Sequence, residues 1–466
     1  MAERKSLDEL DGKALDVTIE NAATPAEVYI DPVKERALIR KIDIRLFPMI
    51  WVCYLMSYID RTNIGNAKVG ECGMAKDLHM SSSDYSLVLS IFFIGYLLFE
   101  PPSNMLLSHA RPSIYIPSIM VIWGAISVAP KGINTTAGMA VFRLFLGLVE
   151  AGFWPGCMLV MSCWYKPDEM SKRTAFFYSA SMVAGAFGGL LAGAIISGMD
   201  GMANTAGWRW LFIIEGLMTV AVALAAFTVL PDFPATTKWI SEDERDLALN
   251  RLLVGGAQPG AGEDNAGHWA SFKAACKDPR TWVFSLTYTF VQGAGTISYF
   301  IPTLMTVQGY KGSQAQYMTV PIYVVSLVFS LFGGWLADRT RQKAYVILGA
   351  ATMSTLSFII CGWAPGHKVK YAFLCFGCAG IWTTVPIFLS WSVIMFDGRE
   401  KRGISFAFVN GIGNLASVYG SWLWPSWNGP KYPIGFGVTT ALCFCIILMV
   451  SFAKWRYGDT GVLKTS

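Results

Sequence analysis

Among the charged residues inside long apolar stretches of this 466-residue chain, four form two groups. Asp60 and Arg61 lie near the end of one stretch, and Arg143 and Glu150 interrupt another. A charged side chain is expensive to place within an apolar helix, so each of the four is a functional candidate. The two guanidinium groups could bind an anion, and the two carboxyl groups could bind protons.

The spacing within each group allows a functional and a structural interpretation. A separation of seven residues places Arg143 and Glu150 on one helix face, about 10 Å apart. They would either face a cavity or form a buried ion pair that fixes helix packing. Asp60 lies about 24 Å along a helix that starts near residue 44, so Asp60 and Arg61 would either face the same cavity or begin a loop. By this count Arg143 lies at the depth of Arg61, and Glu150 lies about two turns deeper.

Neutral residues in other apolar stretches are further candidates for substrate binding. Asn410 and Asn414 lie four residues apart on one helix face, where amide groups need hydrogen-bond partners. Aromatic residues in such stretches more often serve packing than binding. The other neutral candidates are Tyr96, Gln292, Tyr299 and Trp391.

Several charged residues at the ends of apolar stretches have simpler interpretations. Asp338 and Arg339 are candidates for a gate, with charge anchoring of a short loop as the alternative. Glu100, and Arg209 with Glu215, are expected to be helix-end pairs or gates that do not touch a substrate.

The composition indicates which elements hold these residues. Hydrophobic residues make up 53% of the chain and charged residues 15%, with a mean hydropathy of +0.43. A soluble domain carries roughly 25% charged residues, so a soluble enzyme, a coiled coil, a disordered chain and a disulfide-rich scaffold are all excluded. The apolar runs are long enough for membrane helices and too continuous for barrel strands. Twelve runs cover residues 44–62, 85–108, 113–130, 138–164, 174–197, 209–230, 280–304, 315–337, 344–363, 371–396, 403–425 and 434–453.

Two internal similarities divide these twelve runs into halves. The segment that opens at Arg173 resembles the one that opens at Arg402, and Gly147–Pro155 resembles Gly377–Pro386 at nearly the same offset. The sequence therefore predicts an all-α membrane protein with twelve transmembrane helices in two six-helix pseudo-repeat halves, with a binding site between them. The predicted domains are the tail 1–41, the half 42–231, the linker 232–275, the half 276–455 and the tail 456–466.

The distribution of Lys and Arg predicts which side of the membrane each loop faces. If both termini and the linker 232–275 are in the cytosol, most of the Lys and Arg residues of the loops lie on the cytosolic side, as they do in most membrane proteins. We therefore predict this orientation. We expect the plasma membrane as the location. Within the linker we expect a short helix near residues 239–252 followed by a flexible turn, which together act as a solvated tether.

Other classes of function find little support in the sequence. The four His lie at the ends of apolar runs or in loops, so a membrane-embedded enzyme such as an acyltransferase is only a remote alternative. The ten Cys nowhere take zinc spacing, and no run of Lys and Arg with interleaved aromatic residues suggests nucleic-acid binding. We therefore expect no enzymatic activity, no metal, no cofactor and no nucleic acid.

Two motifs resemble a known transporter family. The twelve runs, the halved repeat and the central linker resemble the major facilitator superfamily. Within it, Asp60-Arg-Thr-Asn-Ile-Gly-Asn-Ala67 together with Arg143-x₃-Gly-x₂-Glu150-Ala-Gly152 resembles the anion:cation symporter family, and most closely its fungal allantoate permease branch. This resemblance covers about residues 40–455. It implies import of carboxylates with protons, with Asp60 and Glu150 as protonation sites and Arg61 and Arg143 coordinating the anion or pairing with those acids.

The sequence departs from the family pattern at two places. The superfamily signature between the second and third runs is degraded to Ser108-His-Ala-Arg-Pro112. The seventh run offers Gln292 where some organic-anion carriers have a basic residue, which argues against polyanionic substrates.

The primary hypothesis is a proton-coupled symporter that imports a small organic carboxylate, such as a vitamin or ureide, by alternating access. An exporter or facilitator of an organic-acid secondary metabolite is the alternative. The expected partners are the carboxylate, protons and the lipid bilayer, and we expect a monomer.

Overall fold

A computed structural model describes residues 30–69, 73–237, 239–254, 268–396 and 399–458. Over these ranges the chain forms helices, short 3₁₀ turns and loops, without strands. This agrees with the predicted all-α membrane fold.

Most of the helices follow one another in two series. The first series is α2 (Pro32–Lys68), α4 (Ser82–His109), α5 (Pro112–Ile126), α6 (Thr136–Glu150), α7 (Phe153–Trp164), α8 (Pro167–Gly198) and α9 (Gly207–Val229). The second is α12 (Pro279–Gly295), α13 (Ile301–Val307), α15 (Val320–Thr340), α16 (Lys343–Trp363), α17 (His367–Ile394), α18 (Arg399–Asn414), α19 (Ala416–Gly420) and α20 (Pro433–Tyr457). Shorter helices are α3 (Met74–Asp77), α10 (Glu242–Val254), α11 (His268–Lys277) and α14 (Ser313–Tyr317).

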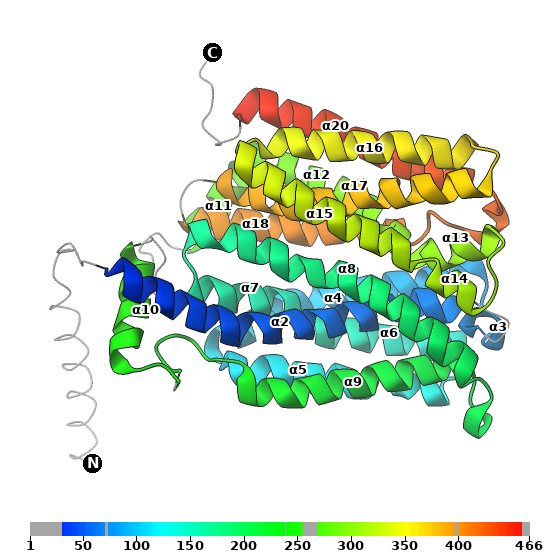
Figure 1. Cartoon of the computed structure of the whole chain (residues 1–466), viewed down its shortest axis with the longest axis horizontal. Coiled ribbons are helices and arrows are strands. Elements are labelled where there is room, and N and C mark those ends of the chain that lie inside the picture. Colours follow the sequence, from blue (N-terminus) through cyan, green and yellow to red (C-terminus); the bar gives the residue numbers. More distant parts are fainter. Residues whose placement is uncertain (1–29, 70–72, 238, 255–267, 397–398, 459–466) are drawn as a thin grey trace.

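The two series form two neighbouring bundles whose helices run in roughly the same direction (Figure 1). Within the first bundle α4 packs against α6, and α5 and α2 both pack against α9. Within the second, α17 packs against both α15 and α16. Helices α8 and α15 meet between the bundles, while α10 lies at one end of the molecule and α3, α13 and α14 lie at the other.

Ten segments of the described chain are long and apolar enough to cross a membrane. They correspond to ten of the twelve predicted runs. The other two runs, 280–304 and 403–425, are each broken into shorter pieces. In the first, a 3₁₀ turn (Thr296–Phe300) separates α12 from α13, and in the second α18 gives way to α19 near Leu415. Both breaks lie beside the central cavity described below.

Helix α2 differs from its predicted extent in a way that concerns the site. It begins at Pro32, where the Asp31 side chain accepts a hydrogen bond from the Val33 backbone N–H, and continues to Lys68. Asp60 and Arg61 are therefore inside a helix, and the alternative that they begin a loop is wrong. The helix is longer than the predicted run because its N-terminal end continues as a polar extension that contacts α10. The distribution of Lys and Arg predicts that this end faces the cytosol.

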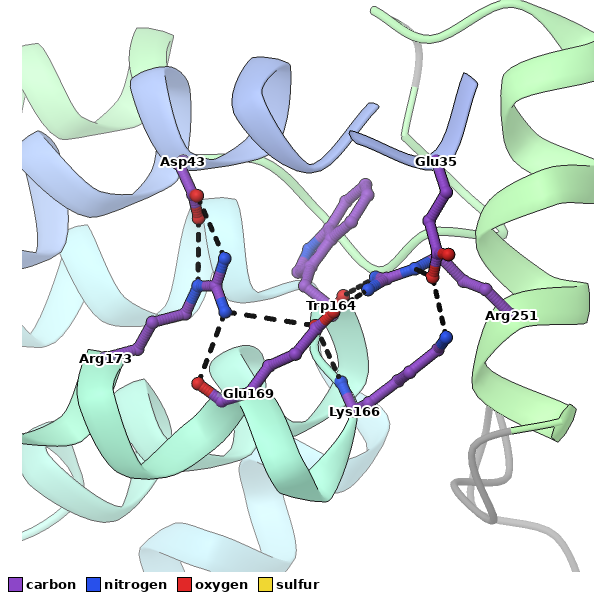
Figure 2. A network of polar contacts seen from close by, with 7 residues as sticks. All are labelled: Glu35, Asp43, Trp164, Lys166, Glu169, Arg173 and Arg251. Carbon is purple, nitrogen blue, oxygen red and sulfur yellow. Dashed lines mark hydrogen bonds and ion pairs between the residues drawn. The ribbon is translucent and has the colours of Figure 1, made fainter. Parts of the chain in front are cut away.

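The linker helix α10 is fixed to the first bundle by a buried arginine (Figure 2). Arg251 has a fully buried side chain and pairs with Glu35 of α2 at 3.1 Å and with Glu169 of α8 at 2.5 Å. It also donates a hydrogen bond to the carbonyl oxygen of Trp164. Lys166 joins the same network by pairing with Glu35.

A second ion pair holds the start of α10. The Lys41 ammonium lies 2.6 Å from Glu244, and hydrogen bonding to Lys41 lowers the pKa of that carboxyl below its ordinary value. The helix near 239–252 is confirmed, as α10 over residues 242–254. The helix itself is not a solvated tether, because a buried guanidinium paired with two carboxylates fastens α10 to the first bundle. The predicted flexible turn lies outside the described residues.

Candidate functional site

A cavity with about 760 Å³ of empty space lies between the two bundles. Both bundles contribute to its wall, as expected for a site between two halves. Six of the predicted residues line it: Arg61, Tyr96, Gln292, Tyr299, Asn410 and Asn414. Arg61 is the only charged side chain among the described residues of the wall.

Arg61 is paired with Glu150 at the edge of this cavity. Its Nη2 lies 2.7 Å from Oε1 of Glu150, and its Nε donates a second, 3.2 Å hydrogen bond to the same oxygen. The Ser57 hydroxyl donates to that oxygen as well, at 2.7 Å. The Glu150 side chain is fully buried, whereas 17% of the Arg61 side chain is exposed. The guanidinium also lies 5.1 Å from the centre of the Tyr96 ring, close enough for a cation–π contact.

Arg143 lies elsewhere than predicted. It is not among the residues that line the cavity, and Glu150 pairs with Arg61. Glu150 pairs with Arg61 instead of forming the Arg143–Glu150 ion pair that was the structural alternative, and the guanidinium of Arg143 lies 4.5 Å from the centre of the Phe92 ring. None of its nitrogens has a hydrogen-bond partner among the described residues, although it is fully buried.

The stacking of Arg143 on Phe92 depends on the close approach of α4 and α6. A Cβ added to Gly147 would collide with the backbone carbonyl oxygen of Phe92. Glycine at this position therefore lets the two backbones touch, as small residues do between membrane helices. The contact brings Phe92 under Arg143, one turn away along α6.

Asp60 points away from the cavity. Its Oδ2 accepts hydrogen bonds from the Trp123 indole N–H at 3.1 Å and the Thr219 hydroxyl at 2.6 Å. Trp123 belongs to α5 and Thr219 to α9, and no residue of these helices lines the cavity. Asp60 and Arg61, although adjacent in sequence, thus face opposite sides of α2.

The second bundle contributes mainly neutral groups. Gln292 donates a 3.0 Å hydrogen bond to Oδ1 of Asn414, which links the broken helices α12 and α18. Asn410 donates a 3.3 Å hydrogen bond to Glu100 of α4, across the two bundles. Asn410 and Asn414 therefore both have the hydrogen-bond partners that amide groups need within a membrane helix. Glu100 forms a contact between the two bundles.

Three further predicted site residues, besides Asp60, Arg143 and Glu150, lie outside the cavity wall. Trp391 is fully buried, with its ring 4.9 Å from that of Phe284, so it packs within the second bundle. Asp338 and Arg339 are exposed at the end of α15, where Arg339 lies over the Trp335 ring. No contact in the described chain places Asp338 and Arg339 at a gate, and that role stays a prediction.

Arg209 and Glu215 do not form the expected pair. Arg209 pairs with Asp77 at 3.0 Å and donates a hydrogen bond to Asn134, at the end of the bundle away from α10. Glu215 lies further along α9 and is buried. Sequence reasoning missed it because Arg209 offered a nearer partner.

The two bundles touch at the end opposite to α10. There Gln316 donates to the Asn66 carbonyl oxygen, and the Tyr85 hydroxyl donates to the carbonyl oxygen of Tyr299. The Ser426 backbone N–H also donates to the Ser82 hydroxyl, at 2.8 Å. These contacts close the cavity on that side.

Some residues of the site had no clear signal in the sequence. Aromatic rings form much of the cavity wall, among them Tyr54, Tyr58, Tyr288, Trp154 and Trp382, but tyrosine or tryptophan occurs in eleven of the twelve apolar runs. Ser57 had a usable signal: it precedes Arg61 by four residues and so shares its helix face.

Comparisons with known proteins agree with this architecture. Residues 50–421 match the family model described as Major Facilitator Superfamily. The transporter prlL from Fungal sp. (strain NRRL 50135), named as an MFS transporter, is 36% identical over 442 residues, covering 93% of this chain and 88% of that protein. A protein from Agrobacterium vitis that carries the provisional name of a tartrate transporter is 29% identical over 389 residues, covering 83% and 84%.

A solved structure shares the fold. The bacterial homologue of the human lysosomal transporter Spinster, in an inward-facing and unoccupied conformation, superposes with a TM-score of 0.66 at 16% identity, covering 91% of this chain and 96% of that one. The sequence contains twelve predicted membrane runs, and the structure has two bundles around a central cavity. The family model matches most of the length of the chain. The chain belongs to the major facilitator superfamily of membrane transporters.

Proposed function

We propose that this transporter is a proton-coupled symporter that imports a small organic carboxylate, and that it belongs to the anion:cation symporter family. The observation that carries the proposal is the Arg61–Glu150 ion pair. Arg61 faces the cavity and Glu150 lies buried behind it. A carboxylate in the cavity would compete with Glu150 for the same guanidinium.

This competition links substrate binding to proton binding. While Glu150 is ionised, its Oε1 accepts two hydrogen bonds from Arg61 and neutralises the cation. When Glu150 takes up a proton, it loses its charge, and the guanidinium becomes available to an anion. Binding of a proton and of a carboxylate therefore favour each other, which is the requirement for symport.

The rest of the cavity restricts the kind of carboxylate. The wall offers one cation and neutral amides such as Gln292, which suits a monoanion better than a polyanion. Aromatic rings favour flat, partly apolar ligands. The relative with the tartrate name supports the carboxylate class. We propose a planar or unsaturated monocarboxylate as the substrate.

The test is transport by Glu150→Gln in proteoliposomes. This variant mimics the protonated acid permanently, so it should exchange labelled for unlabelled substrate at a rate near that of the wild type. It should no longer accumulate substrate when an inward proton gradient is imposed. Glu244→Gln, on α10 and away from the cavity, is the matched control and should accumulate normally.

Two results would contradict the proposal. Gradient-driven accumulation by Glu150→Gln at the wild-type level would show that Glu150 is not the coupling group. Transport driven outward, with substrate leaving vesicles against its gradient as protons enter, would favour the exporter alternative.

A further inference from the structure

A second buried carboxyl group lies next to Asp60, outside the cavity. Glu215 of α9 has a relative exposure of 1%, and its charge interacts with that of Asp60. Arg209, the cation nearest to it in the α9 sequence, is occupied by Asp77 and Asn134. The function proposed above makes no use of Glu215.

Helix periodicity explains why these groups meet. Asp60 and Asn63 are three residues apart on one face of α2, and Glu215 and Thr219 are four residues apart on one face of α9. The two faces pack against each other, and Thr219 donates its hydroxyl proton to Asp60. Glu215 therefore lies one turn from the Thr219–Asp60 hydrogen bond, within reach of the Asn63 amide.

Several polar atoms of this cluster lack partners among the described residues. They are Oδ1 of Asp60, both carboxyl oxygens of Glu215, and both Oδ1 and Nδ2 of Asn63. Asn63 is itself 1% exposed, so water does not replace the missing partners at its surface. A buried amide and three free carboxyl oxygens in one place indicate a site with room for a bound proton and its hydrogen bonds.

The charges around the cluster do not neutralise two carboxylates. Asp60 is surrounded by Trp123 of α5 and Thr219 of α9, and it interacts at longer range with Glu150 and Arg143 of α6. For Glu215, the interacting groups are Asp60 and Asn63 of α2. Arg143 is the one cation in this set, and it lies over Phe92 without a hydrogen bond to either acid. Two like charges so placed in an apolar interior cannot both stay ionised.

We propose that Asp60 and Glu215 form a carboxyl pair that shares one proton, a proton-binding site inside the first bundle that is separate from the Arg61–Glu150 pair. The proton forms an O–H bond on one of the two acids, and the other acid then carries the only negative charge of the pair. Because Asp60 also interacts with the charge of Glu150, neutralising Glu150 favours release of the shared proton. The pair requires no substrate, so it stands or falls independently of the carboxylate proposal.

Infrared spectroscopy of the purified, substrate-free protein tests this site. A protonated carboxyl group has a carbonyl stretching band that an ionised carboxylate lacks, and the band of the wild type should persist at neutral pH. In Glu215→Gln the remaining Asp60 loses its like-charged neighbour. The carbonyl band of the variant should then disappear at a pH about one unit or more below that of the wild type. This shift corresponds to a loss of proton affinity of about tenfold or more.

Asp60→Asn should produce the reciprocal decrease for Glu215, and the double variant should lose the part of the band that comes from this pair. Glu244→Gln, which removes a carboxyl group on α10, is the control and should leave the band and its pH midpoint unchanged. Size-exclusion chromatography identifies any variant that fails to fold. If one single variant does not fold, the pH midpoint of the other single variant is used for the test. An unchanged midpoint in both single variants, or a band in the double variant as intense as that of the wild type, would overturn the proposal.

Discussion

Arg61 has three kinds of neighbour, and their arrangement explains why guanidinium chemistry is needed there. Its Nε and Nη2 both donate to Glu150, its plane lies near the rings of Tyr96 and Phe92, and part of it faces the cavity. A planar cation with five donors can hold one carboxylate while presenting its remaining N–H groups to another. A lysine ammonium has neither the fork nor the stacking surface.

The two arginine candidates should therefore respond differently to lysine substitution. Arg61→Lys should weaken substrate binding about tenfold or more, equivalent to about 1.4 kcal/mol, because the cavity loses its guanidinium. Arg143→Lys should leave affinity nearly unchanged and lower thermal stability, because Arg143 stacks on Phe92 outside the cavity. Equilibrium binding of labelled substrate and thermal unfolding in detergent measure the two effects. A large loss of affinity in Arg143→Lys with none in Arg61→Lys would reverse the assignment.

At the level of elements, the breaks in helices are where the cavity wall forms. The 3₁₀ turn after α12 brings Thr296, Ser298 and Tyr299 to the wall, and α18 ends at Asn414 beside Gln292. Irregular backbone within a membrane is tolerated where it is buried in protein or lines a cavity. The interrupted runs of the second bundle therefore mark the side of the cavity that can change shape.

Helix α10 depends on one buried cation, which gives a test of its attachment. In Arg251→Ala, Glu35 and Glu169 lose that partner, and we expect α10 to detach with a loss of about 3 kcal/mol. Hydrogen–deuterium exchange of the α10 amides should then accelerate about a hundredfold. Arg36→Ala, at an exposed position of α2 beside Glu35, is the matched control and should leave exchange unchanged. Slow exchange retained in Arg251→Ala would mean that apolar packing alone holds α10.

At the scale of the whole molecule, the two bundles are joined at one end and separated by the cavity further in. The joined end includes Ser82 with Ser426 and Asn66 with Gln316. Alternating access requires these contacts to break when the cavity opens on that side. The few polar contacts involved are weak enough to exchange during a transport cycle.

A reversible cross-link tests this movement. In the double variant Ser82→Cys/Ser426→Cys, oxidation should form a disulfide, because the Ser426 backbone nitrogen lies 2.8 Å from the Ser82 hydroxyl. Transport in proteoliposomes should stop on oxidation and return on reduction. Each single cysteine variant, treated with the same oxidant, is the control and should remain active. Full transport by the cross-linked protein would show that this end stays closed throughout the cycle.

The sequence alone determined the class, the fold and several members of the site. Long apolar runs can satisfy their backbone in a membrane only as helices, so composition and length were enough for an all-α membrane fold. Polar residues within such runs are costly, so the positions of Arg61, Gln292, Asn410 and Asn414 in the runs were enough to predict a role in binding. All four line the cavity.

Only the tertiary structure decided which charged groups pair. Spacing along one helix allowed an ion pair of Arg143 with Glu150 and favoured one of Arg209 with Glu215, whereas both acids instead face α2, near Arg61 and Asp60 respectively. Partners on different helices depend on how helices are rotated and how closely they approach, as Gly147 against Phe92 illustrates. Periodicity gives the face of one helix, but it carries no information about which neighbour covers that face.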